Sequence, residues 1–206
     1  MPTPNFRTRI PMMTAATIYA AALAAGPDVT PAERQKALQY LDQTRDGVLA
    51  AVKGLSEEQW KFKPAPDRWS IAEVMEHIAI VEGLFDDSVR PQLENGAPPP
   101  KDRNVEQLDA LILSKLPDRT TKFQAPPEIQ PTGRWTHQEA LDHFLGDRRK
   151  TIEYMQSATS MRQHTVTHPV LGALDGYEWV LLAAGHSERH TKQILEVKAD
   201  PHFPVN

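Results

Sequence analysis

Apolar residues recur at helical spacing in four separate stretches of the chain. Each stretch opens with a capping box, in which an oxygen-bearing side chain is followed three residues later by a Glu that reaches back to the first free amide. The four boxes are Thr30–Glu33, Ser70–Glu73, Thr136–Glu139 and Asp175–Glu178. No stretch alternates convincingly as a β-strand, and turn residues are not spaced as they are in a β-sandwich. The pattern therefore predicts four long helices and no strand.

The lengths of the connections predict how these helices are joined. Residues 56–69 connect the first and second helices, and residues 162–174 connect the third and fourth. Residues 91–135 form a much longer connection, whose prolines forbid a continuous helix. Within it, residues 102–116 are expected to form one short helix on the outside. A connection of this length can cross the bundle, so the second and third helices can run parallel. We predict an all-α fold, a four-helix bundle with a long crossover between helices 2 and 3.

Composition limits the classes of function. The chain has 206 residues, of which 40 % are hydrophobic, and this suits one domain with a real core. Its net charge of -4 argues against a nucleic-acid partner, because duplex-binding proteins normally carry a basic stripe. The chain has no cysteine, which excludes disulfides, thiolate metal sites and a cysteine nucleophile. Any thiol chemistry must therefore come from a substrate.

The first residues have the layout of a secretory signal peptide. Arg7 and Arg9 precede an uncharged, Ala-rich run, and Ala22-Leu23-Ala24 fits the small-x-small pattern that signal peptidase reads. The apolar run is too short and too weakly hydrophobic for a membrane span, so we expect none after processing. We divide the chain into a leader, residues 1–24, and a domain, residues 25–206, and expect export to the periplasm. The alternative is a cytoplasmic protein with a loosely docked N-terminal segment.

Three histidines are the candidate metal ligands. His186 and His190 lie four residues apart on one side of the predicted fourth helix, with Cβ atoms about 6 Å apart. Two imidazoles at that spacing can meet one ion at about 2.1 Å. His77 falls within the apolar stripe of the second helix and is expected to point inward. Three neutral histidines would leave open positions on Zn²⁺, Ni²⁺ or Fe²⁺ for water or substrate. A core histidine bonded to a carbonyl or carboxylate is the other interpretation of His77, and spacing alone leaves both open.

The remaining five histidines are not expected to bind the ion. His143 turns away from the apolar stripe of the third helix and is expected to face solvent, and His137 lies in that helix's first turn with a local role. His164 and His168 belong to the loop before the fourth helix, which we expect them to fix, and His202 lies in the C-terminal tail.

Two motifs resemble the signatures of a known family. "KPAPDRWSIAEVMEHI", residues 63–78, resembles the second-helix signature of the DinB-like superfamily, and "THPVLGALDGYEWVLLAAGHSERHTKQI", residues 167–194, resembles its fourth-helix signature. The resemblance covers residues 30–198 and implies an up-down-down-up bundle with a long crossover. Carried over by motif position, the family's metal ligands are His77, His186 and His190 of this chain.

The resemblance also implies a reaction. Several relatives are S-transferases that use low-molecular-weight thiols such as bacillithiol or mycothiol, so we expect a metal-held thiolate to attack an electrophilic small molecule. Glu73, Glu76 and Glu188 lie near the ligands in sequence and are candidates to support them. A hydrolase that uses metal-activated water is a second hypothesis, although no acidic residue on the inner faces is an obvious base. A third is a non-catalytic, metal-stabilised stress or binding protein. A homodimer is compatible with all three.

Overall fold

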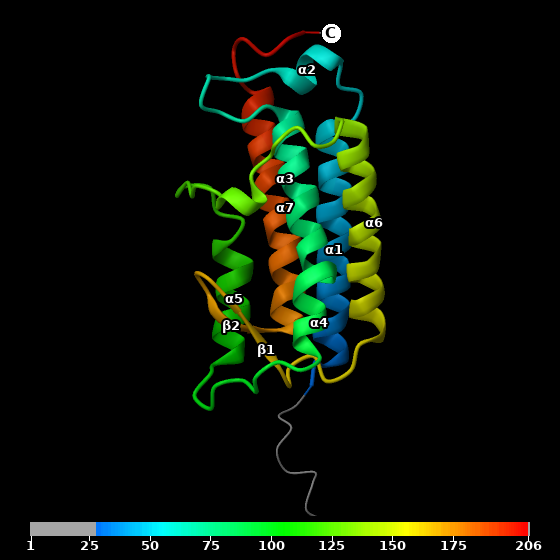
Figure 1. Cartoon of the computed structure of the whole chain (residues 1–206), viewed down its shortest axis with the longest axis vertical. Helices are drawn as coiled ribbons and strands as arrows, with labels where there is room; N and C mark the ends of the chain where they lie inside the picture. The colour runs from blue at the N-terminus through cyan, green and yellow to red at the C-terminus, as the bar shows by residue number, and fades with distance from the viewer. Residues whose placement is uncertain (1–27, 206) are drawn as a thin grey trace, which may run out of the picture.

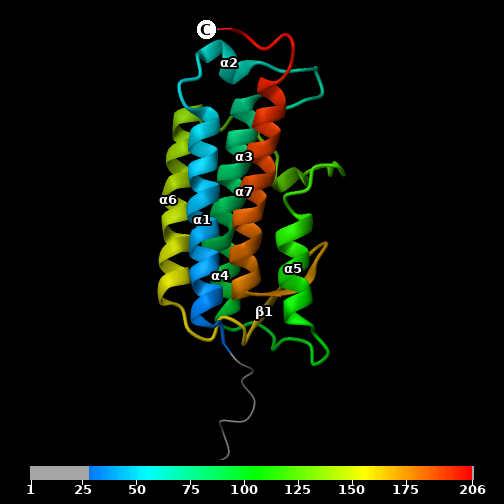
Figure 2. The same cartoon turned by 180° about the vertical axis from the view of Figure 1, so that it is seen from behind.

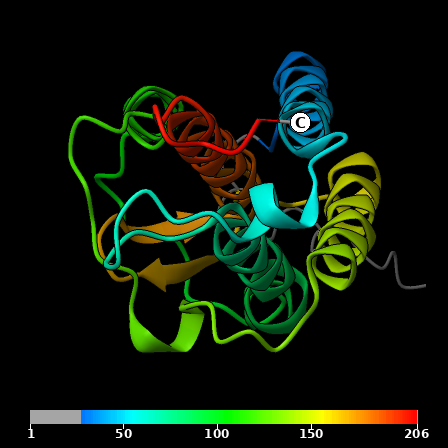
Figure 3. The same cartoon turned by 90° about the horizontal axis from the view of Figure 1, so that it is seen from above.

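The computed structural model describes residues 28–205 and contains four long helices. They are α1 (Pro31–Val52), α3 (Ile71–Leu84), α6 (His137–Ser157) and α7 (Gly176–Lys198). In Figure 1, α1 and α7 run upward, whereas α3 and α6 both run downward. The order is therefore up-down-down-up, and the predicted all-α four-helix bundle is confirmed. Seen from above in Figure 3, α1 and α3 lie at opposite corners, each flanked by α6 and α7.

The four helices begin where the capping boxes predicted. At each start the N-cap side chain accepts the amide of the third helical residue, and the Glu there accepts the amide of the cap. These amides have no partner inside the helix, so the box satisfies them locally. The second helix extends past its expected stripe, because a π-helical turn η1 (Phe85–Val89) and the short helix α4 (Arg90–Leu93) continue α3. A five-residue helix α2 (Glu57–Lys61) lies in the first connection.

A buried polar layer crosses the middle of the bundle. The fully buried Arg148 of α6 donates from Nε and Nη2 to the two carboxylate oxygens of Glu82 on α3, each at 2.7 Å. Its Nη1 donates to the carbonyl of Leu41 and to Oγ1 of Thr44 on α1, and its Nη2 also donates to Oγ of Ser187 on α7. One guanidinium thus bonds to all three other helices. Apolar clusters lie on either side of this layer, so it fixes how the helices align along their length.

The expectation of no strand was wrong. β1 (Thr165–His168) and β2 (Gly172–Asp175) form an antiparallel hairpin in which Thr165 pairs with Asp175. The two strands, TVTH and GALD, do not alternate apolar with polar residues as a half-buried strand does, so the hydrophobic pattern does not mark them. The turn between them is held by His168, whose Nδ1 accepts the amides of Val170 and Leu171. His168 therefore fixes its loop, as expected.

The crossover, residues 94–136, carries the helix α5 (Val105–Lys115) and a short 3₁₀ turn η2 (Pro127–Ile129). The helix begins three residues later than expected, because Asn104 caps it. Figure 2 shows α5 lying outside the bundle alongside α7.

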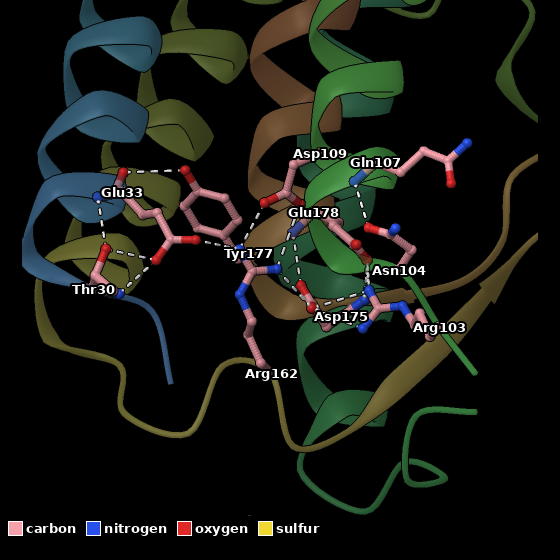
Figure 4. Close-up of polar contacts among 10 residues, drawn as sticks. All are labelled: Thr30, Glu33, Arg103, Asn104, Gln107, Asp109, Arg162, Asp175, Tyr177 and Glu178. Atoms are coloured by element: carbon pink, nitrogen blue, oxygen red, sulfur yellow. Dashed lines mark hydrogen bonds and ion pairs between the residues drawn. The ribbon is translucent and has the colours of Figure 1, made fainter. Parts of the chain in front are cut away.

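Ion pairs hold the N-terminal part of the crossover, around Arg103 and Asp109, against the bundle (Figure 4). Arg103 donates to Asp175 and Glu178 at the start of α7. Arg162 donates to Asp109 of α5, to Asp175, and to Glu33 of α1. Two arginines therefore share four acids, which belong to α1, α5, α7 and the N-cap of α7, and the start of α5 is tied to the start of α7.

The predicted leader, residues 1–24, and its boundary with the domain at residue 25 lie outside the described residues. Within residues 28–205, none of the helices combines the length and apolar character that a membrane span requires.

Candidate metal centre

The three predicted ligands come together between two neighbouring antiparallel helices. His77 projects from α3, and His186 and His190 project from α7. One ring nitrogen from each lies within 4.8 Å of the others, and Nε2 of His77 is 3.1 Å from Nε2 of His186. Nitrogen ligands at about 2.1 Å from one ion stand about 3–3.5 Å apart. The nitrogens of His77 and His186 already have this spacing, and the third nitrogen lies within 4.8 Å of both, so the three histidines can converge on one ion.

The hydrogen bond of His77 fixes which of its nitrogens can bind an ion. Its Nδ1 lies 2.7 Å from the carbonyl oxygen of Ile129 in the crossover. A carbonyl can only accept, so Nδ1 carries the proton and the lone pair of Nε2 remains free. That free nitrogen is the one facing His186. The bond thus selects the tautomer and the ring orientation that metal binding needs.

His190 is oriented in the same way by an amide. Its Nδ1 donates to Oε1 of Gln193 at 2.8 Å, and Nη1 of Arg119 donates to the same oxygen at 3.1 Å. Two donors converging on one atom identify that atom as the oxygen of the amide group rather than its nitrogen. Nε2 of His190 is therefore the free nitrogen on this ring.

Burial keeps the cluster uncharged. The exposed fractions of His77 and His190 are 3 % and 8 %, and His186 is partly exposed. Burial lowers the pKa of His77 despite the bond to Ile129. Burial, followed by the charges of the neighbouring histidines, puts the pKa values of His186 and His190 well below their usual value. All three are neutral near pH 7, which is the form that binds a metal ion.

A model of the DinB superfamily matches residues 40–194, a span that contains all three histidines. The chain belongs to the DinB superfamily. Its sequence is 24 % identical over 149 residues to the uncharacterized protein YuaE of Bacillus subtilis (strain 168), covering 71 % of this chain and 88 % of YuaE.

A solved structure shares the fold of this DinB-superfamily chain. YfiT from Bacillus subtilis matches with a TM-score of 0.53 and 14 % identity, over 82 % of this chain and 88 % of YfiT. YfiT is described as a probable metal-dependent hydrolase with an unusual four-helix bundle topology. At this level of identity the likeness supports the bundle and its order of helices.

Glu73, Glu76 and Glu188 were candidates to support the ligand histidines. In this DinB-superfamily chain their carboxylates bond to other groups. Glu73 completes the cap of α3 and pairs with Lys63. Glu188 accepts the hydroxyl of Tyr40 at 2.7 Å and also pairs with a lysine on its own helix. Among the described contacts, neither carboxylate has a hydrogen bond to a ligand histidine.

Glu76 acts on the site indirectly. Its carboxylate accepts the backbone amides of Thr132, Gly133 and Arg134 in the crossover. Gly133 has φ +74°, a conformation that suits glycine and closes this turn around the carboxylate. Because the turn lies four residues beyond Ile129, it holds in place the segment whose carbonyl orients His77.

Other histidines lie away from the cluster. His137 has the expected local contact and stacks on Trp60 with ring centroids 4.5 Å apart. His143 is exposed to solvent, as expected, and it also stacks on Trp135 at 4.1 Å, a contact that the sequence did not indicate. His164 donates from Nδ1 to a backbone carbonyl in α4 at 2.8 Å.

Sequence reasoning missed both groups that orient the ligands. Gln193 follows His190 by three residues, so its place on the same helical face was readable. The carbonyl of Ile129 carries no such signal, because every residue has one.

Proposed function

We propose that this protein is a metal-dependent enzyme in which His77, His186 and His190 hold one divalent transition-metal ion: zinc, nickel or iron. We further propose that it transfers a low-molecular-weight thiol to an electrophilic small molecule. The observation that carries the proposal is the convergence of three neutral imidazoles, two of them oriented by acceptors on Nδ1.

The donor set fits such an ion. Imidazole nitrogen is a ligand suited to zinc, nickel and iron, and three protein ligands leave positions open for an exogenous group. His186 is the partly exposed member of the cluster, so an incoming ligand would approach from its side. Trp69 packs against His77 with ring centroids 4.9 Å apart and forms an apolar wall there.

The charge of the site favours an anionic ligand. A bound divalent ion lowers the pKa of a thiol or water that it coordinates. The two groups that orient its ligands, a backbone carbonyl and an amide, are neutral. No carboxylate charge from these partners would offset the charge of the ion. A thiolate would supply the missing negative charge.

Thiol transfer requires fewer additional groups than hydrolysis does. A thiol has an ordinary pKa of about 8.5 and ionises near neutral pH when coordinated. Hydrolysis benefits from a general base within hydrogen-bonding reach of the attacking water. Glu188 is paired with Tyr40, and Glu76 is bonded to the crossover backbone. Both are occupied, which favours the thiol.

Hydrolysis is the second candidate, because YfiT is described as a probable metal-dependent hydrolase. A screen of thiol and electrophile pairs, run beside ester and amide substrates, separates the two. The matched variants are His186→Ala, which removes a ligand, and His143→Ala, which removes a histidine stacked on Trp135. Metal-dependent conjugation that His186→Ala abolishes would support thiol transfer. Turnover of esters or amides alone would replace it with hydrolysis. A bound ion without any turnover would indicate the non-catalytic alternative.

We also propose that residues 1–24 are a cleavable leader and that the domain acts outside the cytoplasm on a small molecule. The proposal rests on Arg7 and Arg9, the Ala-rich run and the motif Ala22-Leu23-Ala24.

A further inference from the structure

We infer that Gln193 is a positioning residue of the metal centre and that, through it, metal affinity depends on the docking of the crossover. The inference rests on the metal binding proposed above. Gln193 joins two parts of the molecule: it accepts from the ligand His190 and from Arg119 of the crossover through the same oxygen.

The position of Arg119 is fixed by a second, stronger contact. Its Nε and Nη2 donate to the two carboxylate oxygens of Glu196 at 2.7 Å and 2.8 Å. A two-pronged contact of this kind sets the plane of the guanidinium as well as its distance. The side chain of Arg119 is 11 % exposed, so it is largely withdrawn from water. Its remaining nitrogen, Nη1, then points at the amide oxygen of Gln193.

The same part of the crossover also accepts hydrogen bonds from a side chain of α7. Arg189 of α7 donates to the carbonyl of Asp118 and, at 2.6 Å, to the carbonyl of Thr121. Further along, the carbonyl of Ile129 accepts from His77. The crossover therefore reaches two of the three ligands, one through Gln193 and one directly. If this segment moved away, His77 would lose its acceptor and Gln193 would lose the arginine that orients it.

The physical consequence falls on metal affinity. A ligand imidazole without an acceptor on Nδ1 can change tautomer or rotate, and either change removes the free Nε2 from the cluster. Loss of such a partner typically weakens metal binding by about 10–100-fold. A purely structural Gln193, one that merely covers the helix surface, would change the melting temperature and leave metal affinity alone.

The test is a comparison of zinc dissociation constants, measured by competition with a chromophoric chelator on the full chain. Gln193→Leu keeps the approximate shape and removes the acceptor, whereas Gln193→Glu keeps an acceptor at the same place. Gln138→Leu is the matched control, because within residues 28–205 the side chain of Gln138 donates to the exposed Asp142 on α6 and to no other group. We expect a rise of about 10–100-fold in the dissociation constant for Gln193→Leu, and values within a few-fold of the original chain for Gln193→Glu and Gln138→Leu.

Arg119→Met extends the test to the crossover. Its effect on zinc affinity should be smaller than that of Gln193→Leu, and smaller again when Gln193 is already Leu, because the contact between Arg119 and the oxygen of Gln193 is then already lost. Hydrogen exchange provides a second readout: zinc should slow the exchange of amides in residues 117–126 of the original chain and fail to do so in Gln193→Leu.

The outcomes separate this inference from the proposed function. An original chain that binds no zinc, nickel or iron overturns both. An original chain that binds metal, together with a Gln193→Leu variant of equal affinity, overturns the role of Gln193 alone. Additive effects of Arg119→Met and Gln193→Leu would overturn the link to the crossover.

Discussion

The buried pair of Arg148 and Glu82 gives the sharpest test of how the bundle is held together. The perturbation is Glu82→Leu, which removes both carboxylate oxygens that accept from Arg148 at 2.7 Å. The guanidinium would keep its bonds to Leu41, Thr44 and Ser187, all uncharged, and would remain buried without a counter-charge. The structure offers it no path to water, because Arg148 is 0 % exposed.

Leaving one partner of a buried ion pair in place costs about 3–5 kcal/mol of the free energy of unfolding. For a domain of this length, about 2–4 °C of melting temperature is lost per kcal/mol, so the expected fall is about 6–20 °C. The assay is thermal and urea unfolding of the metal-free chain, followed by circular dichroism. An unchanged urea m-value would show that the native state stays compact.

The double variant Arg148→Met with Glu82→Leu is the control that tests the reasoning. It removes the buried charge together with its partner, and such replacements are often neutral or stabilising. We expect it to be more stable than Glu82→Leu alone. A loss below about 1 kcal/mol for the single variant, or a double variant that is less stable still, would refute the claim that an unpaired charge is the source of the effect.

Four further predictions concern the centre and the chain start. Purified protein should carry close to one transition-metal ion per chain by elemental analysis, and His186→Ala should lose it; unchanged metal content after replacing all three histidines would disprove the site. Chelation should lower the melting temperature by several degrees, an order-of-magnitude expectation, because the ion favours the folded chain; identical melting curves after confirmed metal removal would contradict this. Burial lowers the pKa values of the three histidines, so below their ordinary value of 6.5 the unfolded chain binds more protons than the folded chain. The free energy of unfolding of metal-free protein should therefore decrease as the pH falls through that window, and replacing the three histidines with Asn should weaken that dependence; urea titrations showing equal slopes would count against it. A chain beginning at Ala25 should fold and bind metal like the full chain, and mass spectrometry of protein from the native host should find an N-terminus near that residue rather than Met1.

The sequence by itself determined where the helices begin and which way their histidines face. A capping box spans only four residues, so those at Thr30, Ser70 and Thr136 could be recognised without knowledge of the fold. Helical periodicity likewise placed His77 on the inner face of its helix, because the apolar neighbours on that face are local. The parallel arrangement of α3 and α6 followed from the length of the connection between them together with the family resemblance.

Tertiary structure decided what surrounds the histidines. Periodicity says that His77 points inward, but only the placement of α3 beside α7 brings its Nε2 to 3.1 Å from that of His186. The acceptor for His77 is a carbonyl 52 residues away in the crossover, and a backbone group has no identity in a sequence. Likewise, Arg119 reaches Gln193 across 74 residues. Local spacing can fix the direction of a side chain, because a helix has a regular geometry. The partner it meets depends on how an irregular segment packs, and that is settled by the sum of many distant contacts.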